Sequence, residues 1–229
     1  MIEHKIKIIA HIRTDFKEKF GIPRQSGVVP DLIGKIVFEK KYRDINALRG
    51  LEKFSHLWLI WQFSKNANNE CFPTIRPPRL GGEERVGIFA TRSPFRPNSI
   101  GLSSVELDHI EQTTNEGPVI YVKGADLLDG TPIYDIKPYI PYTDAHTEAK
   151  CSFAKSDWER KLEVDFPQEL LNEIEEEKQQ SIINILAQDP RPAYKEDSEH
   201  IYTMAFADYQ ISFLVKNNLL RVTGVDKQH

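Results

Sequence analysis

The chain has 229 residues, of which 40% are apolar and 28% are charged, and its formal net charge is −4 at neutral pH. This apolar content can support a folded core, which excludes wholesale disorder, and the acidic balance argues against a protein that coats nucleic acid indiscriminately. Two cysteines without CxxC spacing exclude a disulfide framework and predict a reduced, cytoplasmic setting.

Neither the amino-terminal residues nor any apolar run predicts a membrane protein. The amino-terminal residues have charges within their apolar run and no small-residue cleavage site, so no signal peptide is expected. The longest apolar run, 57–61, is far shorter than the roughly 20 residues that cross a bilayer. Residues 148–199 carry fourteen acidic and seven basic side chains, a local balance of −7 that leaves +3 for the remainder. We therefore expect two units, at residues 1–145 and 146–229.

The first unit consists of short strands separated by glycine and proline turns. Residues 5–13 alternate between polar and apolar side chains, as in a half-buried strand. Residues 20–29 form a loop and residues 44–54 resemble a short helix. Six or so short strands with almost no helix fit a closed antiparallel barrel or a sandwich. Further strands are expected at 34–39, 55–63, 85–92, 100–110 and 118–123.

The run 55–63, SHLWLIWQF, predicts a strand that is buried on both faces. Within it, His56 is interpreted as a satisfied core histidine rather than a base, and Trp58 and Trp61 as core residues. Cys71 is interpreted as a small apolar filler rather than a nucleophile.

The second unit is predicted to be small and α+β. Residues 168–188 form an amphipathic pattern with apolar side chains near helical spacing, and Asp189-Pro190 ends the expected helix. Residues 201–215 and 219–225 alternate around Asn217-Asn218, which predicts a hairpin.

The stretch 76–107 is the most unusual part of the sequence. It contains five arginines and no lysine, together with four prolines and four glycines that fix loop conformations. Since guanidinium groups bind phosphate and carboxylate through paired hydrogen bonds, we expect a surface facing a polyanion. An exposed loop with scattered arginines is the alternative. The five are Arg76, Arg79, Arg85, Arg92 and Arg96.

Several common sites have no support in the sequence. It contains no GxGxxG motif after a strand, no GxxxxGK[ST] phosphate loop, no HExxH motif and no Cys/His cluster for a metal. The run 129–139, DGTPIYDIKPY, is instead a cluster of turn formers whose Asp129 and Thr131 can bind backbone or ligand. A tight turn followed by an ion pair between Asp135 and Lys137 is the plain structural alternative.

Five motifs in order along the chain resemble those of the TrmO family of tRNA methyltransferases, and the likeness covers nearly the full length. The run LAQDPRPAY at 186–194 is similar to the carboxy-terminal element of bacterial members. The motifs are Pro23-Arg24-Gln25, 49–58, 76–82, 87–101 (GIFATRSPFRPNSIG) and 129–139.

The resemblance implies an enzyme that transfers a methyl group from S-adenosylmethionine to N6 of threonylcarbamoyladenosine at position 37 of tRNAs reading ACY codons. It also implies a small antiparallel barrel in place of a Rossmann sheet, which agrees with the missing glycine motif. Family members are homodimers whose cofactor lies close to the dimer interface.

Carried over residue by residue, the resemblance implies a cofactor site that uses no metal. Arg92 matches the family's cofactor arginine, which suits a carboxylate partner. There are two departures from the family: Ser64-Lys65 replaces His-Gln, which puts that contact in doubt, and Ser99 replaces a proline. The matching positions are Pro23, Arg24, Gln25, Arg92, Leu102, Asp129, Gly130, Thr131 and Pro132, and Ser64 and Lys65 occupy the remaining ones.

No residue stands out as the base that takes the proton from the target nitrogen, and Asp135 and His56 are the only candidates. Arg76, Arg79, Arg85 and Arg96 are expected to bind tRNA phosphates or the threonylcarbamoyl carboxylate. Two competing interpretations remain. One is an RNA-binding barrel without turnover, disfavoured because the aromatic residues cluster in the apolar run; the other is a scaffold that recruits partners through its acidic helix.

Overall fold

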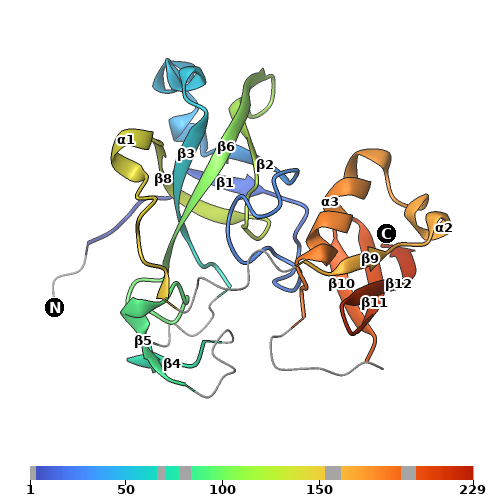
Figure 1. The fold of residues 1–229 in the computed structure, drawn as a ribbon. Helices are drawn as coiled ribbons and strands as arrows, with labels where there is room; N and C mark the ends of the chain where they lie inside the picture. Colours follow the sequence, from blue (N-terminus) through green and yellow to red (C-terminus); the bar gives the residue numbers. More distant parts are fainter. Residues whose placement is uncertain (1–3, 66–70, 78–83, 153–160, 192–199, 229) are drawn as a thin grey trace.

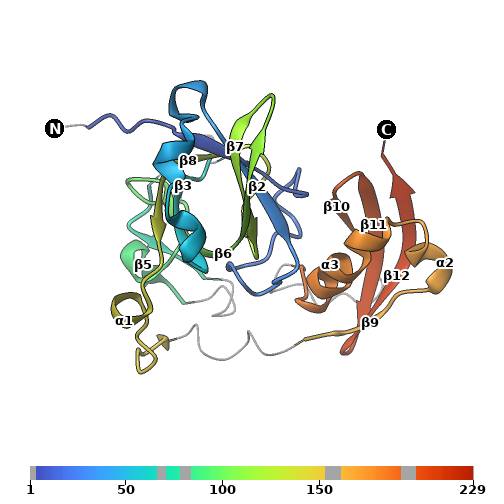
Figure 2. The same cartoon turned by 90° about the horizontal axis from the view of Figure 1, so that it is seen from above.

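The computed structural model describes residues 4–65, 71–77, 84–152, 161–191 and 200–228. Two folded parts lie side by side, a barrel built from the first half of the chain and a smaller sheet with helices from the second (Figure 1, Figure 2). The protein is therefore mainly β, as the sequence predicts.

Six strands close into an antiparallel barrel in the order β1-β2-β7-β6-β3-β8. Closure occurs where β1 pairs with β8, with Ala10 opposite Ile133. Inward side chains of all six strands fill the interior, so the barrel is a packed core and not an open channel. The strands are β1 (Ala10–Arg13), β2 (Ile33–Phe38), β3 (His56–Gln62), β6 (Ile100–Thr113), β7 (Gly117–Lys123) and β8 (Thr131–Pro138).

Strand β3 is buried on one face only, which corrects the prediction of burial on both. Leu57, Leu59 and Trp61 point into the barrel, whereas Trp58 is half-buried on the outside, where its indole N–H donates to Asp144 Oδ2 at 2.9 Å. His56 is exposed, because it begins the strand at the barrel rim, so its assignment to the core is wrong.

The predicted strand at 85–92 is mostly absent. Only β5 (Val86–Gly87) forms, paired with β4 (Thr74–Ile75), and a 3₁₀ turn follows at Ile88–Ala90. Both the backbone N–H and the hydroxyl of Thr91 donate to the Ile88 carbonyl, which turns the chain away from the sheet. Cys71 in the same region is exposed, not a buried filler.

Two more element predictions need correction. The expected helix at 44–54 is a pair of 3₁₀ turns, Ile45–Leu48 and Leu51–Lys53, separated by Gly50 in the left-handed region at φ 92°. The first predicted strand begins only at Ala10, and Ile6 and Ile8 before it are exposed.

The carboxy-terminal part packs helices against a four-stranded sheet of order β10-β11-β12-β9. The predicted helix at 168–188 is broken after its first turn, and the hairpin around Asn217 is extended by a third strand that turns at Ala207 in the left-handed region at φ 53°. In the described part of the chain no helix has the length and apolarity to cross a membrane. The short helix α1 (Pro141–Asp144) still lies beside the barrel (Figure 1). The elements of the carboxy-terminal part are β9 (Glu163–Asp165), α2 (Gln168–Leu171), α3 (Glu176–Ala187), β10 (Tyr202–Phe206), β11 (Tyr209–Lys216) and β12 (Leu219–Lys227).

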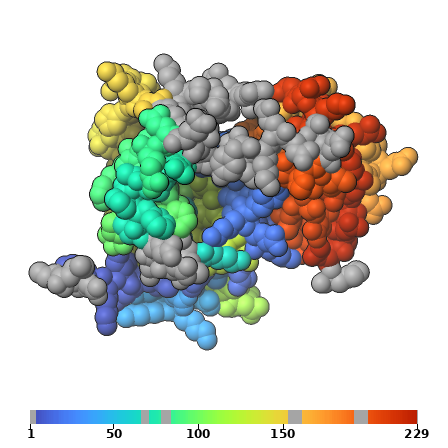
Figure 3. Space-filling view, turned by 90° about the horizontal axis from the view of Figure 1, so that it is seen from below, coloured from blue at the N-terminus to red at the C-terminus, as the bar shows by residue number. Residues whose placement is uncertain are grey.

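The loop between β1 and β2, residues 14–32, joins the two parts. Its Phe16, Val29 and Leu32 belong to the same buried cluster as Ile182 of α3 and the inner face of the carboxy-terminal sheet. The loop surface, blue, lies directly against the orange and red surface of the carboxy-terminal part (Figure 3). The core of the second part is thus completed by residues from the first.

Polar contacts fix the same loop at both of its ends. Lys178 pairs with Asp15 at 3.0 Å, and Asn184 donates to Asp31 Oδ2 at 2.6 Å. Lys17 also pairs with Asp208 at 2.7 Å. Buried apolar contacts and bridging hydrogen bonds together hold the middle of the loop, residues 20–27, in one position.

We expect Gly101→Ala to lower the free energy of unfolding by about 2 kcal/mol, because overpacking a filled core costs this order of energy. A Cβ at this position would lie 2.3 Å from the Trp61 ring. Urea unfolding measures the change. Gly87→Ala is the matched control, since nothing lies within 4 Å of its added Cβ. Equal stability of the two variants would contradict the packing described here.

Candidate functional site

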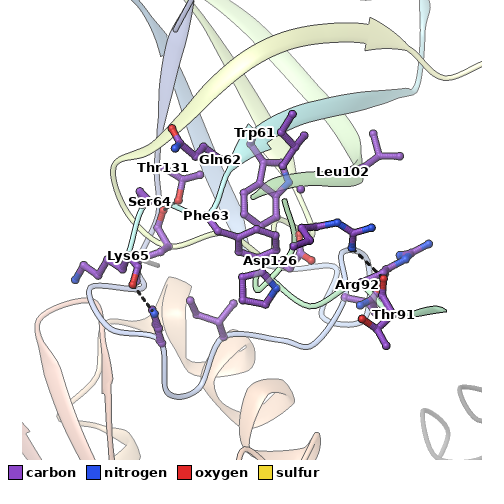
Figure 4. A pocket seen from close by; sticks show the side chains of 18 of the residues that line it. Trp61, Gln62, Phe63, Ser64, Lys65, Thr91, Arg92, Leu102, Asp126 and Thr131 are labelled. Carbon is purple, nitrogen blue, oxygen red and sulfur yellow. Dashed lines mark hydrogen bonds between the residues drawn. The ribbon is translucent and has the colours of Figure 1, made fainter. Parts of the chain in front are cut away.

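A pocket of about 790 Å³ opens at the end of the barrel where β3 ends and β6 begins (Figure 4). Four segments distant in the sequence form its walls: the β1–β2 loop, the end of β3, the loop before β6, and the turn before β8. Eight of the eleven predicted cofactor residues line it. They are Pro23, Arg24, Gln25, Ser64, Lys65, Arg92, Leu102 and Thr131.

Arg92 and Gln25 meet across the mouth of the pocket. Arg92 is exposed, and its guanidinium donates to Gln25 Oε1, while Gln25 Nε2 donates to the Arg24 carbonyl at 2.6 Å. Arg24 in turn donates to the carbonyl of Arg191 at 3.5 Å. The motif loop 23–25 is therefore tied to the arginine stretch on one side and to the carboxy-terminal part on the other.

Asp126 in the pocket wall was not predicted from the sequence. Its Oδ1 accepts from Ser103 Oγ at 2.7 Å, and Ser103 Oγ accepts from the Trp61 indole N–H at 3.0 Å. Burial raises the pKa of this carboxyl, opposed by the Ser103 hydrogen bond and by the charge of Arg92. The available signal was an acid set among apolar residues, in the run Ala125-Asp126-Leu127.

The end of β3 supplies an apolar and a polar side of the pocket. Trp61 and Phe63 are in edge contact, with ring centroids 4.3 Å apart. Ser64 and Lys65 follow at the exposed mouth, where the Lys65 carbonyl accepts from Lys19 Nζ at 2.8 Å. This backbone contact fixes the position of the Ser64-Lys65 segment.

Only part of the run 129–132 lines the pocket, and the rest forms the turn before β8. Thr131 lines the pocket, and its hydroxyl donates to the Leu128 carbonyl at 2.7 Å. Asp129 Oδ1 instead accepts from the Thr14 backbone N–H at 3.0 Å, and Gly130 adopts φ 73° in the turn. Asp129, Gly130 and Pro132 are not among the described residues that line the pocket.

The two candidate bases lie away from the pocket. His56 is at the start of β3, about 20 Å of strand from Gln62 at the pocket end. Asp135 is not among the described residues that line the pocket, and it pairs with Lys137 at 2.9 Å, as the plain structural alternative had it. Among the described residues no group of His, Cys, Asp and Glu could hold a metal ion.

Of the remaining arginines that the structure describes, one lines the pocket and two lie beside the small sheet. Arg96 lines the pocket and donates to the Thr91 carbonyl at 3.0 Å, whereas Arg76 and Arg85 are exposed beside β4 and β5. Arg85 Nε donates to Thr74 Oγ1 at 3.0 Å. Arg79 lies outside the described residues.

Exposed aromatic side chains accompany these arginines. Phe89 lines the pocket and is 78% exposed. Phe72 and Phe95 form an exposed edge-to-face pair with centroids 5.7 Å apart. The sequence had indicated that the aromatic residues cluster in the apolar run. In the structure three further aromatic residues lie on the loops around the pocket.

Known proteins match this chain over most of its length. The tRNA (adenine(37)-N6)-methyltransferase of Escherichia coli (strain K12) is 40% identical over 224 residues, which cover 94% of each chain. The Pseudomonas aeruginosa protein described as "Putative S-adenosylmethionine-dependent methyltransferase RcsF" is 39% identical over 84% of each. A crystal structure of TrmO from Pseudomonas aeruginosa superposes with a TM-score of 0.81 at 33% identity, covering 99% of this chain and 98% of the other.

Family models divide the chain in the same way as the two folded parts. The tRNA-methyltransferase O N-terminal domain matches residues 11–145, and the TrmO C-terminal domain matches residues 159–228. The match spans both parts and includes the walls of the pocket. The chain belongs to the TrmO family.

Proposed function

We propose that this protein is a tRNA methyltransferase that uses S-adenosylmethionine to methylate N6 of the adenosine at position 37. The observation that carries the proposal is the single pocket that joins the motif residues of the β1–β2 loop, the end of β3, Arg92 and Thr131. The Escherichia coli relative, which matches over 94% of the chain, bears this activity in its name, and the name of the Pseudomonas aeruginosa relative gives the methyl donor.

The pocket has the size and the chemical groups that S-adenosylmethionine requires. A volume of about 790 Å³ is within the range of small-molecule sites. Trp61 and Phe63 offer apolar surface for the adenosyl group, and the exposed guanidinium of Arg92 can pair with a carboxylate. We propose that the eight predicted residues in the pocket wall bind the cofactor, and that Asp129, Gly130 and Pro132 support the turn that presents Thr131.

Methyl transfer from S-adenosylmethionine mainly requires the protein to position the methyl donor and the target nitrogen. Bound S-adenosylmethionine supplies a methyl group already activated by its sulfonium. The chain's own residues have to orient the target nitrogen in line with that group and exclude water. The Trp61 ring and the buried Leu128 give the pocket a water-excluding wall on the barrel side.

The surface around the pocket suits the RNA. Arg76, Arg85 and Arg96 present cationic groups for phosphates, and Phe89 presents an exposed ring on which a base can stack. We propose threonylcarbamoyladenosine in tRNAs reading ACY codons as the substrate, since an arginine at the pocket mouth can bind the threonyl carboxylate. We also propose a homodimer, as the resemblance implies. A reduced, cytoplasmic setting is proposed because both cysteines, Cys71 and Cys151, are free and exposed.

Calorimetry with S-adenosylmethionine tests the cofactor site. Arg92→Ala is expected to weaken binding at least tenfold, because the pairing of a guanidinium with the cofactor carboxylate is lost. Arg85→Ala, which removes an arginine outside the pocket, is the matched control and should leave the affinity unchanged. Equal losses in both variants would argue against the proposed site, and no binding by the wild-type protein at millimolar cofactor would refute the proposed activity.

Methyl transfer to tRNA with and without the threonylcarbamoyl group tests the substrate. The modified tRNA is expected to react at least a hundredfold faster at limiting concentration. Its added carboxylate and amide can pair with polar groups at the pocket mouth, and these groups stay unpaired when unmodified adenosine binds. Equal rates on the two tRNAs would show that the enzyme does not recognise the modification.

Phe89→Ala should raise the KM for tRNA roughly tenfold, since stacking of one base on an aromatic ring contributes about 1–3 kcal/mol. The affinity for S-adenosylmethionine should stay within twofold of the wild type. Phe54→Ala is the control, because Phe54 is 40% exposed but lies near the start of β3, away from the pocket. A similar KM change in both variants would exclude a specific role for Phe89.

A further inference from the structure

Asp126 is the single acidic residue among the described residues that line the pocket. Five cationic side chains line the same space: Lys19, Arg24, Lys65, Arg92 and Arg96. A ligand that carries only negative charge would gain nothing from a buried carboxylate in this wall. The one acid in a basic pocket therefore points to a ligand with a positive group as well as a negative one.

The carboxylate is held in place by the barrel itself. Ser103 of β6 donates to Asp126 Oδ1 at 2.7 Å, and the Trp61 indole of β3 donates to Ser103 Oγ at 3.0 Å. Ser103 is 2% exposed and Trp61 is 7% exposed, so neither donor can turn away to water. This chain of donors fixes Oδ1 of the carboxylate in the pocket wall, and the backbone N–H groups of Ser26 and of Asp126 itself also act to lower its pKa.

Asp126 forms no ion pair within 4 Å among the residues that the structure describes, although Arg92 is close enough for its charge to act on the carboxyl pKa. A desolvated carboxylate without a cation in contact is costly. A cationic group entering the pocket would remove that cost. The position is thus suited to receive an ammonium group.

An amino acid end carries a carboxylate and an ammonium on neighbouring atoms, and the pocket wall offers a cation and an anion near each other. We propose that Asp126 accepts the α-ammonium group of S-adenosylmethionine while Arg92 binds its α-carboxylate. The proposal rests on the proposed function and adds a contact to it: Asp126 is a binding and positioning residue that fixes the amino acid end of the cofactor.

Asp126→Asn is the direct test, because it keeps the shape and the Ser103 hydrogen bond and removes the charge. Calorimetry would use three ligands: S-adenosylhomocysteine, its analogue without the α-amino group, and 5′-methylthioadenosine, which lacks the whole amino acid end. In the wild type, removing the amino group is expected to weaken binding at least tenfold. In Asp126→Asn, the two ligands that differ only in the amino group should bind within threefold of each other.

Affinity for 5′-methylthioadenosine should be the same in wild type and Asp126→Asn, since that ligand has no ammonium. Asp44→Asn is the matched control, because Asp44 caps a 3₁₀ turn outside the pocket through the Asn46 N–H and asparagine can keep that cap. All three affinities should be unchanged in it. The wild-type comparison of the first two ligands keeps the test decisive if the Asp126 variant fails to fold.

Three results would overturn the proposal. Wild-type protein that binds both amino and deaminated ligands equally would show that no ammonium site exists. Equal loss of all three ligands in Asp126→Asn would assign the residue to the architecture of the wall. Unchanged binding with slower single-turnover methylation and an altered pH profile would make Asp126 a proton acceptor instead. Wild-type protein that binds no adenosyl ligand would refute the proposed function itself, a result distinct from these three.

Discussion

The structure of the site depends on the burial of one loop in the core of the other folded part. Residues 14–32 leave the barrel after β1, contribute Phe16, Val29 and Leu32 to the carboxy-terminal core, and return to β2. The same loop carries Pro23, Arg24 and Gln25 into the pocket. The first flank is packed and ion-paired and the second is packed and hydrogen-bonded, so the carboxy-terminal part supports one wall of a site that lies on the barrel. Contacts distant from the pocket thus order the loop that we propose binds the cofactor.

The charged side chains of the pocket are also held in place by packing and hydrogen bonds elsewhere in the barrel. The stretch 76–107 is not one uniform surface, since Arg92 and Arg96 line the pocket while Arg76 and Arg85 lie beside the small sheet. Gly101 lets the Trp61 ring lie against β6, and that ring directs Ser103 and, through it, Asp126. A packed barrel core thus sets the direction of the one acid among the cationic side chains.

Local patterns predicted a closed barrel or a sandwich and the hairpin at Asn217, because alternation and turn chemistry depend on neighbouring residues. The residues of the pocket were predicted from the resemblance to the TrmO family. Contacts between distant segments were not predictable in this way. The strand expected at 85–92 gives way to a 3₁₀ turn held by Thr91, and the helix at 168–188 is broken where Tyr209 binds the Glu175 N–H. Asp126 was overlooked since its role depends on Ser103 and Trp61, which meet it only in the closed barrel. His56 lies in an apolar run yet is exposed, because burial at a strand end follows from the barrel rim and not from sequence neighbours.

The pocket is walled by a loop that the carboxy-terminal core holds in place, and we propose that the enzyme methylates tRNA at position 37 in this pocket. Nucleoside mass spectrometry of tRNA from a strain lacking the gene, complemented with the wild type or with Arg92→Ala, tests it most directly. The account predicts that N6-methylated threonylcarbamoyladenosine disappears in the deletion strain, returns with the wild type and stays absent or strongly reduced with the variant. An unchanged level of the methylated nucleoside in the deletion strain would contradict it.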